Sequence, residues 1–160
     1  MHTPPLSIEM RVLDPRLHDW GLPRYQTEMA AAWDLYACLQ EPIEIKAGDP
    51  AVLIPSGFAL LMGQANMAAV ILPRSGMGHK KGLVMGNAVG LIDPDYTAEI
   101  MISCWNRNPI GSEPIVITPG DRIAQLMFVP VLRPSVNVVE DFTQDTARGA
   151  GGFGSTGVAP

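Results

Sequence analysis

The chain consists mainly of short apolar runs separated by glycine and proline, and this spacing limits the folds it can adopt. Sixteen Gly and fifteen Pro among 160 residues are too many for a helical bundle. Both residue types are favoured in turns, so they suit a fold of short, closely connected strands. The pattern shows no long amphipathic helix and no alternation of strand and helix. We therefore predict an all-β fold, a distorted jelly-roll-like β-barrel or sandwich with one short helix.

Alternating or continuous apolar patterns indicate where the strands lie. The expected strands are 7–13, 33–39, 42–46, 51–54, 57–62, 67–72, 83–85, 88–93, 98–106, 114–117 and 122–132. Helix is the alternative for 30–39, because its alanines favour a helix whereas the flanking turns favour a strand. Runs 67–72 and 98–106 are apolar on both faces, which predicts that each is covered on both sides. Segment 14–25 is interrupted by proline and glycine and is expected to be irregular, whereas 74–81 is the expected short helix.

Length and charge bound the class of protein. Residues 1–146 are expected to form a single β-domain, followed by a flexible Gly-rich arm at 147–160. A formal net charge of −5 argues against a nucleic-acid binder, which would carry a basic face. No apolar run approaches about 18 residues, so no membrane span is expected. The N-terminal residues lack a signal-peptide pattern, and Cys38 and Cys104 form no CxxC pair, so we expect a cytoplasmic location.

Polar residues that are able to carry chemistry gather in segment 73–106. Asp93 precedes a proline, so it is either a carboxylate presented at a strand end as a general base or simply the first residue of a turn. Asn87 follows Gly86 in what the spacing predicts is a two-residue hairpin turn, and its amide is also able to read a base edge. Arg74, Ser75 and Gly76 precede the expected helix, either as phosphate ligands or as a solvated Arg beside a helix-capping Ser.

The glycine-rich tail is similar to a P-loop but lacks its lysine and has no strand before it or helix after it. We therefore reject a P-loop. A single aromatic residue, Phe153, stands among the glycines with Arg148, Ser155 and Thr156 nearby. These residue types suit an arm that folds over a phosphorylated ligand, with stacking by the ring and phosphate binding by the others.

Taken together, these segments resemble the trimeric dUTPase (dUTP diphosphatase) family, bacterial type. Five motifs occur in the family's order over most of the chain. They are Ala31-Ala-Trp-Asp34-Leu-Tyr-Ala37, Pro73-Arg-Ser-Gly76, Gly90-Leu-Ile-Asp93-Pro-Asp-Tyr96-Thr-Ala-Glu99, Gly120-Asp-Arg-Ile-Ala-Gln125 and Arg148-Gly-Ala-Gly-Gly-Phe153-Gly154-Ser155-Thr156.

The resemblance implies a homotrimer with three active sites at subunit interfaces. It implies hydrolysis of dUTP to dUMP and pyrophosphate, which keeps uracil out of DNA and supplies dUMP for thymidylate synthesis. Asp93 would activate the water that attacks the α-phosphorus. Mg²⁺ would bind mainly to the substrate phosphates, with Asp34 acting only through water. Phosphate charge would be stabilised by Arg74, Ser75, Gly76, Gln125 and Arg148.

The resemblance also assigns the nucleoside. Uracil would be read by a hairpin that includes Asn87, the backbone of Gly90, Leu91 and Ile92, and Met101. Tyr96 would lie against the sugar and exclude a ribose hydroxyl. Phe153 would stack on the base, while Gly154, Ser155 and Thr156 would hold the γ-phosphate, from the arm of another subunit.

The chain departs from the family pattern at Ala32, Tyr36 and Ala98, where the family usually has Gly, often Arg, and Gly respectively. A Cβ at Ala98 matters if the backbone there needs a positive φ. Two alternatives remain beside the dUTPase reading. One is a dCTP deaminase on the same fold, and the other is a non-catalytic nucleotide-sensing trimer.

Overall fold

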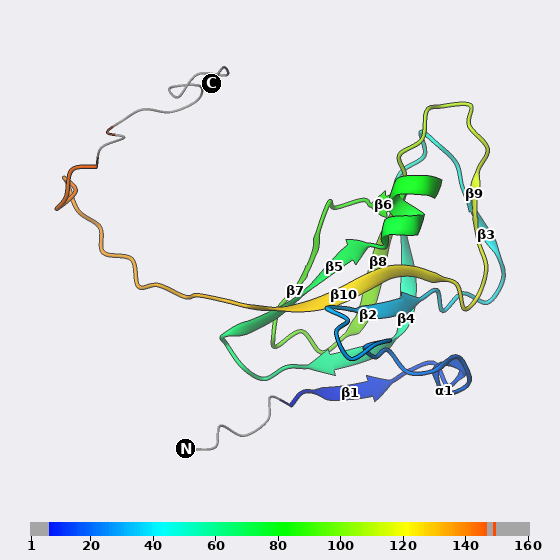
Figure 1. The fold of residues 1–160 in the computed structure, drawn as a ribbon, viewed down its shortest axis with the longest axis horizontal. Helices are drawn as coiled ribbons and strands as arrows, with labels where there is room; N and C mark the ends of the chain where they lie inside the picture. The colour runs from blue at the N-terminus through cyan, green and yellow to red at the C-terminus, as the bar shows by residue number, and fades with distance from the viewer. Residues whose placement is uncertain (1–6, 147–148, 150–160) are drawn as a thin grey trace.

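The computed structural model of the chain describes residues 7–146 and 149, and it confirms the all-β prediction (Figure 1). Two four-stranded antiparallel sheets and one two-stranded sheet form the body. Sheet A has the order β1 (Glu9–Val12), β4 (Val52–Leu61), β8 (Glu99–Asn106), β6 (Leu83–Met85). Sheet B has the order β2 (Trp33–Tyr36), β10 (Arg122–Pro130), β5 (Met67–Pro73), β7 (Gly90–Ile92). Sheet C pairs β3 (Ile43–Ile45) with β9 (Ile115–Ile117).

One hydrophobic core lies between the sheets. Sheet A contributes buried Phe58 from β4 and Ile102 from β8, and sheet B contributes Leu35, Ile71 and Leu126 from three neighbouring strands. Ile71, Ile102 and Leu126 alternate with more exposed neighbours along their strands, as the period of two requires. Phe58 instead lies in a stretch of β4 where its neighbours are also buried. The core therefore joins the faces of two sheets, which is the arrangement of a sandwich.

The described residues contain two short helices, one more than predicted. Helix η1 (Gly76–Lys81) is a π-helix and lies where the short helix was expected. Helix α1 (Arg16–Trp20) lies in segment 14–25, so the prediction that this whole segment is irregular was wrong. Pro15 precedes its first residue, and the Asp14 carboxylate accepts a hydrogen bond from the Arg16 backbone N–H at 3.0 Å. Proline and a capping acid start a helix here, and Gly21 with φ 92° ends it.

Two strand predictions need correction. Runs 51–54 and 57–62 are parts of one strand, β4, whose register against β8 shifts between Pro55 and Ala59. Gly57 lies within this irregularity with φ 80°, a conformation that glycine adopts without strain. In β8, only one face is fully buried within the single chain, since Trp105 on the other face is 39% exposed. The prediction of cover on both sides of β8 is therefore wrong for one chain, whereas β5 is mostly buried.

The two-residue hairpin predicted at Gly86-Asn87 is also wrong. β6 before it pairs with β8 in sheet A, while β7 after it pairs with β5 in sheet B. The chain has to cross from one sheet to the other, which a tight hairpin does not allow. The crossing turn contains Ala88, the only non-glycine residue with a positive φ (64°) within 7–146 and 149. Ala98 does not share this conformation, so the loss of the family's glycine there imposes no such strain.

Beyond β10 the chain extends away from the sheets as a long trace, drawn in gold and orange in Figure 1. Apolar side chains on this segment lie in water within the single chain, with Leu132, Val136, Val138 and Phe142 each at least 85% exposed. Leu132, Val136 and Val138 have even numbers and precede the bend at residues 140 and 141, so they would share one face of an extended strand. None of the helices in the described residues is long and apolar enough to cross a membrane.

Candidate active site

Three charged side chains meet at one end of sheet B. Asp34 lies on β2, Arg74 follows β5, and Arg122 begins β10. The Arg74 Nε lies 2.8 Å from Asp34 Oδ1, and Arg122 Nη1 donates to Asp34 Oδ2 at 3.0 Å. Arg74 Nη1 also donates to the Arg122 carbonyl oxygen at 3.0 Å. The Asp34 side chain is only 13% exposed, so one largely buried carboxylate joins two arginines.

Gln125 belongs to the same end of the sheet. It lies opposite Asp34 in the register of β2 with β10 and opposite Leu72 in the register with β5. Its Nε2 donates to the Pro73 carbonyl oxygen at 2.9 Å, directly before Arg74. The structure therefore brings together three residues of the predicted site, Asp34, Arg74 and Gln125.

A cationic pocket of about 290 Å³ opens beside these residues. It is lined by Arg74, Met77, Lys81, Gly120, Asp121 and Arg122. Three of these side chains are cationic and one is anionic, and the Asp121 carboxylate accepts a hydrogen bond from the Thr118 backbone N–H. This excess of positive charge suits an anionic group such as a phosphate.

Ser75 and Gly76 follow Arg74 and are both exposed. Ser75 occupies the position before η1, but its hydroxyl makes no capping hydrogen bond. The capping alternative for Ser75 is thus not seen, and its hydroxyl remains available to a ligand. The alternative of a solvated Arg74 is also not seen, because this arginine is paired with Asp34.

Asp93 lies elsewhere, directly after β7. Its carbonyl oxygen accepts a hydrogen bond from the Tyr96 N–H at 3.1 Å, so residues 93–96 form the turn that the Asp-Pro pair predicts. The Asp93 side chain is exposed, and the Tyr96 hydroxyl donates to the Glu99 carbonyl oxygen at 3.0 Å. The turn reading and the catalytic reading of Asp93 are therefore compatible, since the turn uses its backbone and leaves its carboxylate free.

The residues predicted to read the base lie around the open edge of β7. Sheet B ends at β7, which pairs with β5 on one side, and no described strand pairs with its other edge. β8 pairs with β6 only over Cys104 to Asn106, so the β8 edge at Met101 is also open among the described residues. Asn87 and Leu91 are exposed, and Gly90 is buried. Two open backbone edges on consecutive strands offer N–H and C=O groups to a planar ligand.

The two halves of the predicted site are well separated within one chain. Ile92 pairs with Ala69, whereas Arg74 follows Pro73 at the other end of the same strand. At about 3.3 Å per residue, the six steps along the strand from Ala68 to Arg74 span roughly 20 Å. A single chain therefore does not bring Asp93 together with Arg74.

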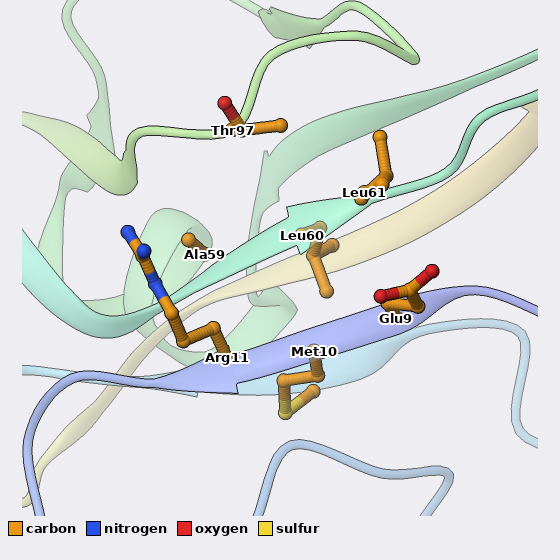
Figure 2. Close-up of a pocket in the computed structure, with 7 residues that line it drawn as sticks. All are labelled: Glu9, Met10, Arg11, Ala59, Leu60, Leu61 and Thr97. Atoms are coloured by element: carbon orange, nitrogen blue, oxygen red, sulfur yellow. The ribbon is translucent and has the colours of Figure 1, made fainter.

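Another pocket, of about 240 Å³, lies between β1, β4 and the loop before β8 (Figure 2). It is lined by Glu9, Met10, Arg11, Ala59, Leu60, Leu61 and Thr97, none of which is a predicted site residue. Figure 2 shows Glu9 and Arg11 on β1, with Thr97 on the facing loop. This pocket contains no set of groups arranged for the hydrolysis of a phosphate ester.

The cysteines belong to the core, as expected. Both are free and buried, and burial raises the pKa of each thiol to about 12. For Cys38, the nearby Asp14 carboxylate adds to this effect. Thiols with so high a pKa are poor nucleophiles at neutral pH, so neither is a catalytic candidate.

The side chains around Asp34 suit a metal ion that is held mainly by a substrate. The described residues hold no group of three or more His, Cys, Asp or Glu side chains that is able to hold one. Each Asp34 carboxylate oxygen already faces one arginine, at 2.8 and 3.0 Å. A carboxylate neutralised in this way fits a supporting contact through water better than direct coordination, so a Mg²⁺ ion here would need oxygens from the substrate.

Several predicted residues cannot be placed. Arg148, Phe153, Gly154, Ser155 and Thr156 lie outside the described residues. Conversely, the sequence analysis missed Arg122, which lies within the quoted fourth motif but was assigned no role. Its signal was available, because a basic residue opening a strand three positions before Gln125 is able to meet an acid on the neighbouring strand.

Comparisons with known proteins assign this chain to one family. The dUTPase family model matches residues 18–157. The chain belongs to the dUTPase family. A deoxyuridine 5'-triphosphate nucleotidohydrolase of Xanthomonas oryzae pv. oryzae (strain MAFF 311018) is 52% identical over 159 residues, 99% of both chains. Its counterpart in Coxiella burnetii (strain Dugway 5J108-111) is 53% identical over 152 residues, 94% of this chain and 97% of the relative.

Solved structures of dUTPases share the fold. The dUTPase of Staphylococcus bacteriophage 80alpha with dUpNHpp has a TM-score of 0.77 at 23% identity, covering 95% of this chain and 99% of the phage chain. A mutant dUTPase from phage phi11 of S. aureus, described with a structural Mg(II) ion, has a TM-score of 0.73 at 22% identity, over 86% and 99% of the two chains. The predicted family, and with it a dUTP-hydrolysing enzyme of nucleotide metabolism, is confirmed.

Proposed function

We propose that this chain is a Mg²⁺-dependent dUTP diphosphatase that hydrolyses dUTP to dUMP and pyrophosphate at sites shared between the subunits of a homotrimer. The observation that carries the proposal is the cationic end of sheet B, where Asp34 and Arg122 hold Arg74 beside a pocket. Family membership supplies the substrate.

The phosphates would bind at this cationic end. Arg74, the Ser75 hydroxyl, the Gly76 backbone and Gln125 would stabilise the charge that develops on the phosphate oxygens. When bound to the phosphates, Mg²⁺ would neutralise part of the charge of the leaving pyrophosphate, with Asp34 in contact through water. Arg148, Gly154, Ser155 and Thr156 of the arm would add donors from outside the described residues.

The nucleoside would bind at the open edges of β7 and β8. The Asn87 amide and the backbone of Gly90, Leu91, Ile92 and Met101 would hydrogen-bond to uracil, with Phe153 stacked on its face. Tyr96, held by its hydrogen bond to the Glu99 carbonyl oxygen, would pack against the deoxyribose. Asp93, exposed directly after β7, would take the proton from the attacking water.

A homotrimer would join the two halves. Arg74 and Asp93 are roughly 20 Å apart along β5 in one chain, which is too far for one substrate. A neighbouring subunit would place its own Asp93 beside the Arg74 of the first, and a third chain would supply the arm. The exposed apolar face of segment 131–142 and the half-exposed outer face of β8 are surfaces that such an assembly would cover.

One assay tests the function. Purified protein is incubated with dUTP, dTTP, dCTP and UTP in the presence of Mg²⁺, and pyrophosphate and ammonia are measured. We expect pyrophosphate from dUTP alone and none after chelation of the metal. Ammonia from dCTP would assign a deaminase instead, and binding of dUTP without turnover would assign a nucleotide sensor.

Asp93→Asn tests the general base. The variant keeps the turn and the shape of the side chain but cannot accept the proton, so kcat should fall by about 10² to 10⁴-fold. Binding of dUpNHpp, measured by calorimetry, should survive. Asp49→Asn is the matched control, because Asp49 also precedes a proline in an exposed turn. Unchanged turnover in Asp93→Asn would remove Asp93 from the mechanism.

A further inference from the structure

We propose that Arg122 is a positioning residue for the phosphate-binding arginine, acting through Asp34. This inference rests on the proposed function of the same site. The family resemblance assigns no role to Arg122 and places Asp34 only near the metal. The structure links both of them to Arg74 by three contacts of 2.8 to 3.0 Å.

Arg74 is held by only some of its hydrogen-bond donors. A guanidinium group has five N–H donors in a rigid plane. Here Nε faces Asp34 Oδ1, and Nη1 donates to the Arg122 carbonyl oxygen. Within the described part of the chain, Nη2 makes no hydrogen bond. These two contacts therefore fix the orientation of the plane and leave the remaining donors, including both N–H groups of Nη2, for a phosphate.

Each oxygen of the Asp34 carboxylate faces a different arginine. Asp34 Oδ1 faces Arg74, so rotation of the carboxylate would break that contact. Arg122 Nη1 holds the other oxygen, Oδ2, at 3.0 Å. Arg122 thereby prevents rotation of the carboxylate and keeps Oδ1 directed at Arg74. Arg122 also makes the cluster cationic. Two arginines and one carboxylate carry a net charge of +1, whereas Asp34 and Arg74 alone would be neutral.

The fold holds Arg122 in place. The turn before it is tied to the end of β2, since Gly120 N–H donates to the Ala37 carbonyl oxygen at 3.0 Å and Ala37 N–H donates to that of Asp121 at 2.8 Å. Gly120 has φ 87°, and a Cβ there would lie 3.1 Å from the Trp20 ring. Tyr36, one of the departures from the family pattern, donates from its hydroxyl to the Trp20 carbonyl oxygen at 3.0 Å. Helix α1 and Tyr36 thus support the turn from which Arg122 projects.

A direct role of Arg122 on substrate is the competing explanation, since its side chain is 45% exposed and lines the same pocket. The two roles differ in their dependence on Asp34. A direct phosphate contact works whether or not Asp34 is charged, whereas positioning requires the Asp34 carboxylate.

The test is a double-mutant cycle of Arg122→Ala and Asp34→Asn in the full-length protein. Affinities for dUpNHpp and for deoxyuridine, which has no phosphate, are measured by calorimetry. Arg122→Ala removes one positive charge in both backgrounds. The long-range effect of that charge on phosphate binding is therefore the same in the wild-type and the Asp34→Asn proteins. In the wild-type background we expect a loss of dUpNHpp affinity of roughly tenfold to hundredfold. In the Asp34→Asn background, the loss of dUpNHpp affinity caused by Arg122→Ala should be smaller by a factor of about ten or more.

Deoxyuridine affinity should stay within about twofold in every variant, because the change acts on phosphate binding alone. Lys46→Ala, which removes a positive charge from the turn before β4, is the control and should leave both affinities unchanged. Light scattering and the melting temperature check assembly and folding, and Arg122→Lys replaces Arg122→Ala if the latter fails to assemble.

Equal losses in both backgrounds would overturn the inference and assign Arg122 a direct contact. A parallel loss of deoxyuridine affinity would also overturn it, because the effect would then be a general loss of structure. Failure of the wild-type protein to bind dUpNHpp at all would instead remove the proposed function.

Discussion

Single residues in this chain act through the contacts that fix them, and Asp14 illustrates this outside the site. Its carboxylate accepts hydrogen bonds from the Arg16 Nε at 3.0 and 3.1 Å and from the Arg16 backbone N–H. The guanidinium of Arg16 also donates to the Leu39 carbonyl oxygen at 2.7 Å. Asp14 therefore starts α1 and, through Arg16, ties it to the segment after β2.

Asp14 predicts a pH dependence of stability. The hydrogen bonds from Arg16 lower the pKa of the Asp14 carboxyl below its ordinary value of 3.8. The unfolded state then binds more protons than the folded state near this pH, so the stabilisation is complete above pH 3.8 and is lost as the pH falls through the folded-state pKa. Asp14→Asn keeps the capping acceptor but removes the charge. It should lower the melting temperature at pH 7, and the gap to wild type should close as the pH falls below about 4.

Glu44→Gln, on an exposed position of β3, is the control and should show a much smaller gap at pH 7. The exposure of the Arg16–Asp14 pair, 31% and 16%, means that salt should narrow the gap as well. A gap that is constant from pH 7 to pH 3 would show that the charge of Asp14 does not contribute.

At the scale of the elements, the sequence predicts the strands better than the connections between them. Alternation places β1, β8 and β10 within a few residues of their observed bounds, because a period of two follows directly from strand geometry. α1 was missed because the prolines and glycines around it indicate turns and because five residues are too few to show a helical period. The turn at Gly86-Asn87 was read as a hairpin because local spacing does not say which sheet the next strand joins.

The same limit applies to the site. Asp34, Arg74 and Gln125 were predicted from their motifs, and their proximity follows from the pairing of β10 with both β2 and β5. Arg122 was missed because its role depends on that tertiary pairing and on a turn tied to Ala37. The separation of Asp93 from Arg74 depends on the antiparallel register of β5 with β7, which no local pattern reveals.

Deletion of residues 147–160 tests the arm as an element. It removes the predicted donors Arg148, Ser155 and Thr156 and the stacking ring of Phe153, which alone is worth about 1–3 kcal/mol by analogy with base stacking elsewhere. We expect kcat/KM for dUTP to fall by at least about tenfold, while the melting temperature changes little. Deletion of residues 158–160 alone, beyond the fifth motif, is the control. A full-length rate from the longer deletion would show that the arm does not close the site.

At the scale of the whole molecule, the single chain leaves apolar surface in water after β10. Val136 and Val138 are 85% and 91% exposed, and Leu132 and Phe142 are 91% and 92% exposed. Burying one such side chain contributes about 1.5–3 kcal/mol, so several of them contribute substantially to an assembly. The proposed trimer would place this face against a neighbouring subunit.

The double substitution Val136→Asp and Val138→Asp tests this. Two carboxylates on the apolar face would have to lose their water on assembly, so the mass in light scattering should fall from three times 17.2 kDa towards a single chain. Activity should fall with it. Ser135→Asp and Asn137→Asp, on the opposite face, are the control pair and should leave the trimer intact. An intact, active trimer of the valine variant would exclude this face from the interface.

The distance between Asp93 and Arg74 along β5 has a genetic consequence. If each site takes its arginine from one chain and its carboxylate from another, then an Asp93→Asn chain still supplies an intact arginine and an Arg74→Ala chain still supplies an intact carboxylate. Unfolded together in equal amounts and refolded, they should form mixed trimers in which about a quarter of the sites combine two intact contributions. Two inactive variants would then form a mixture with about 25% of wild-type activity, whereas neither variant regains activity when it is refolded alone. Two defective alleles of this gene in one cell would complement each other in the same way.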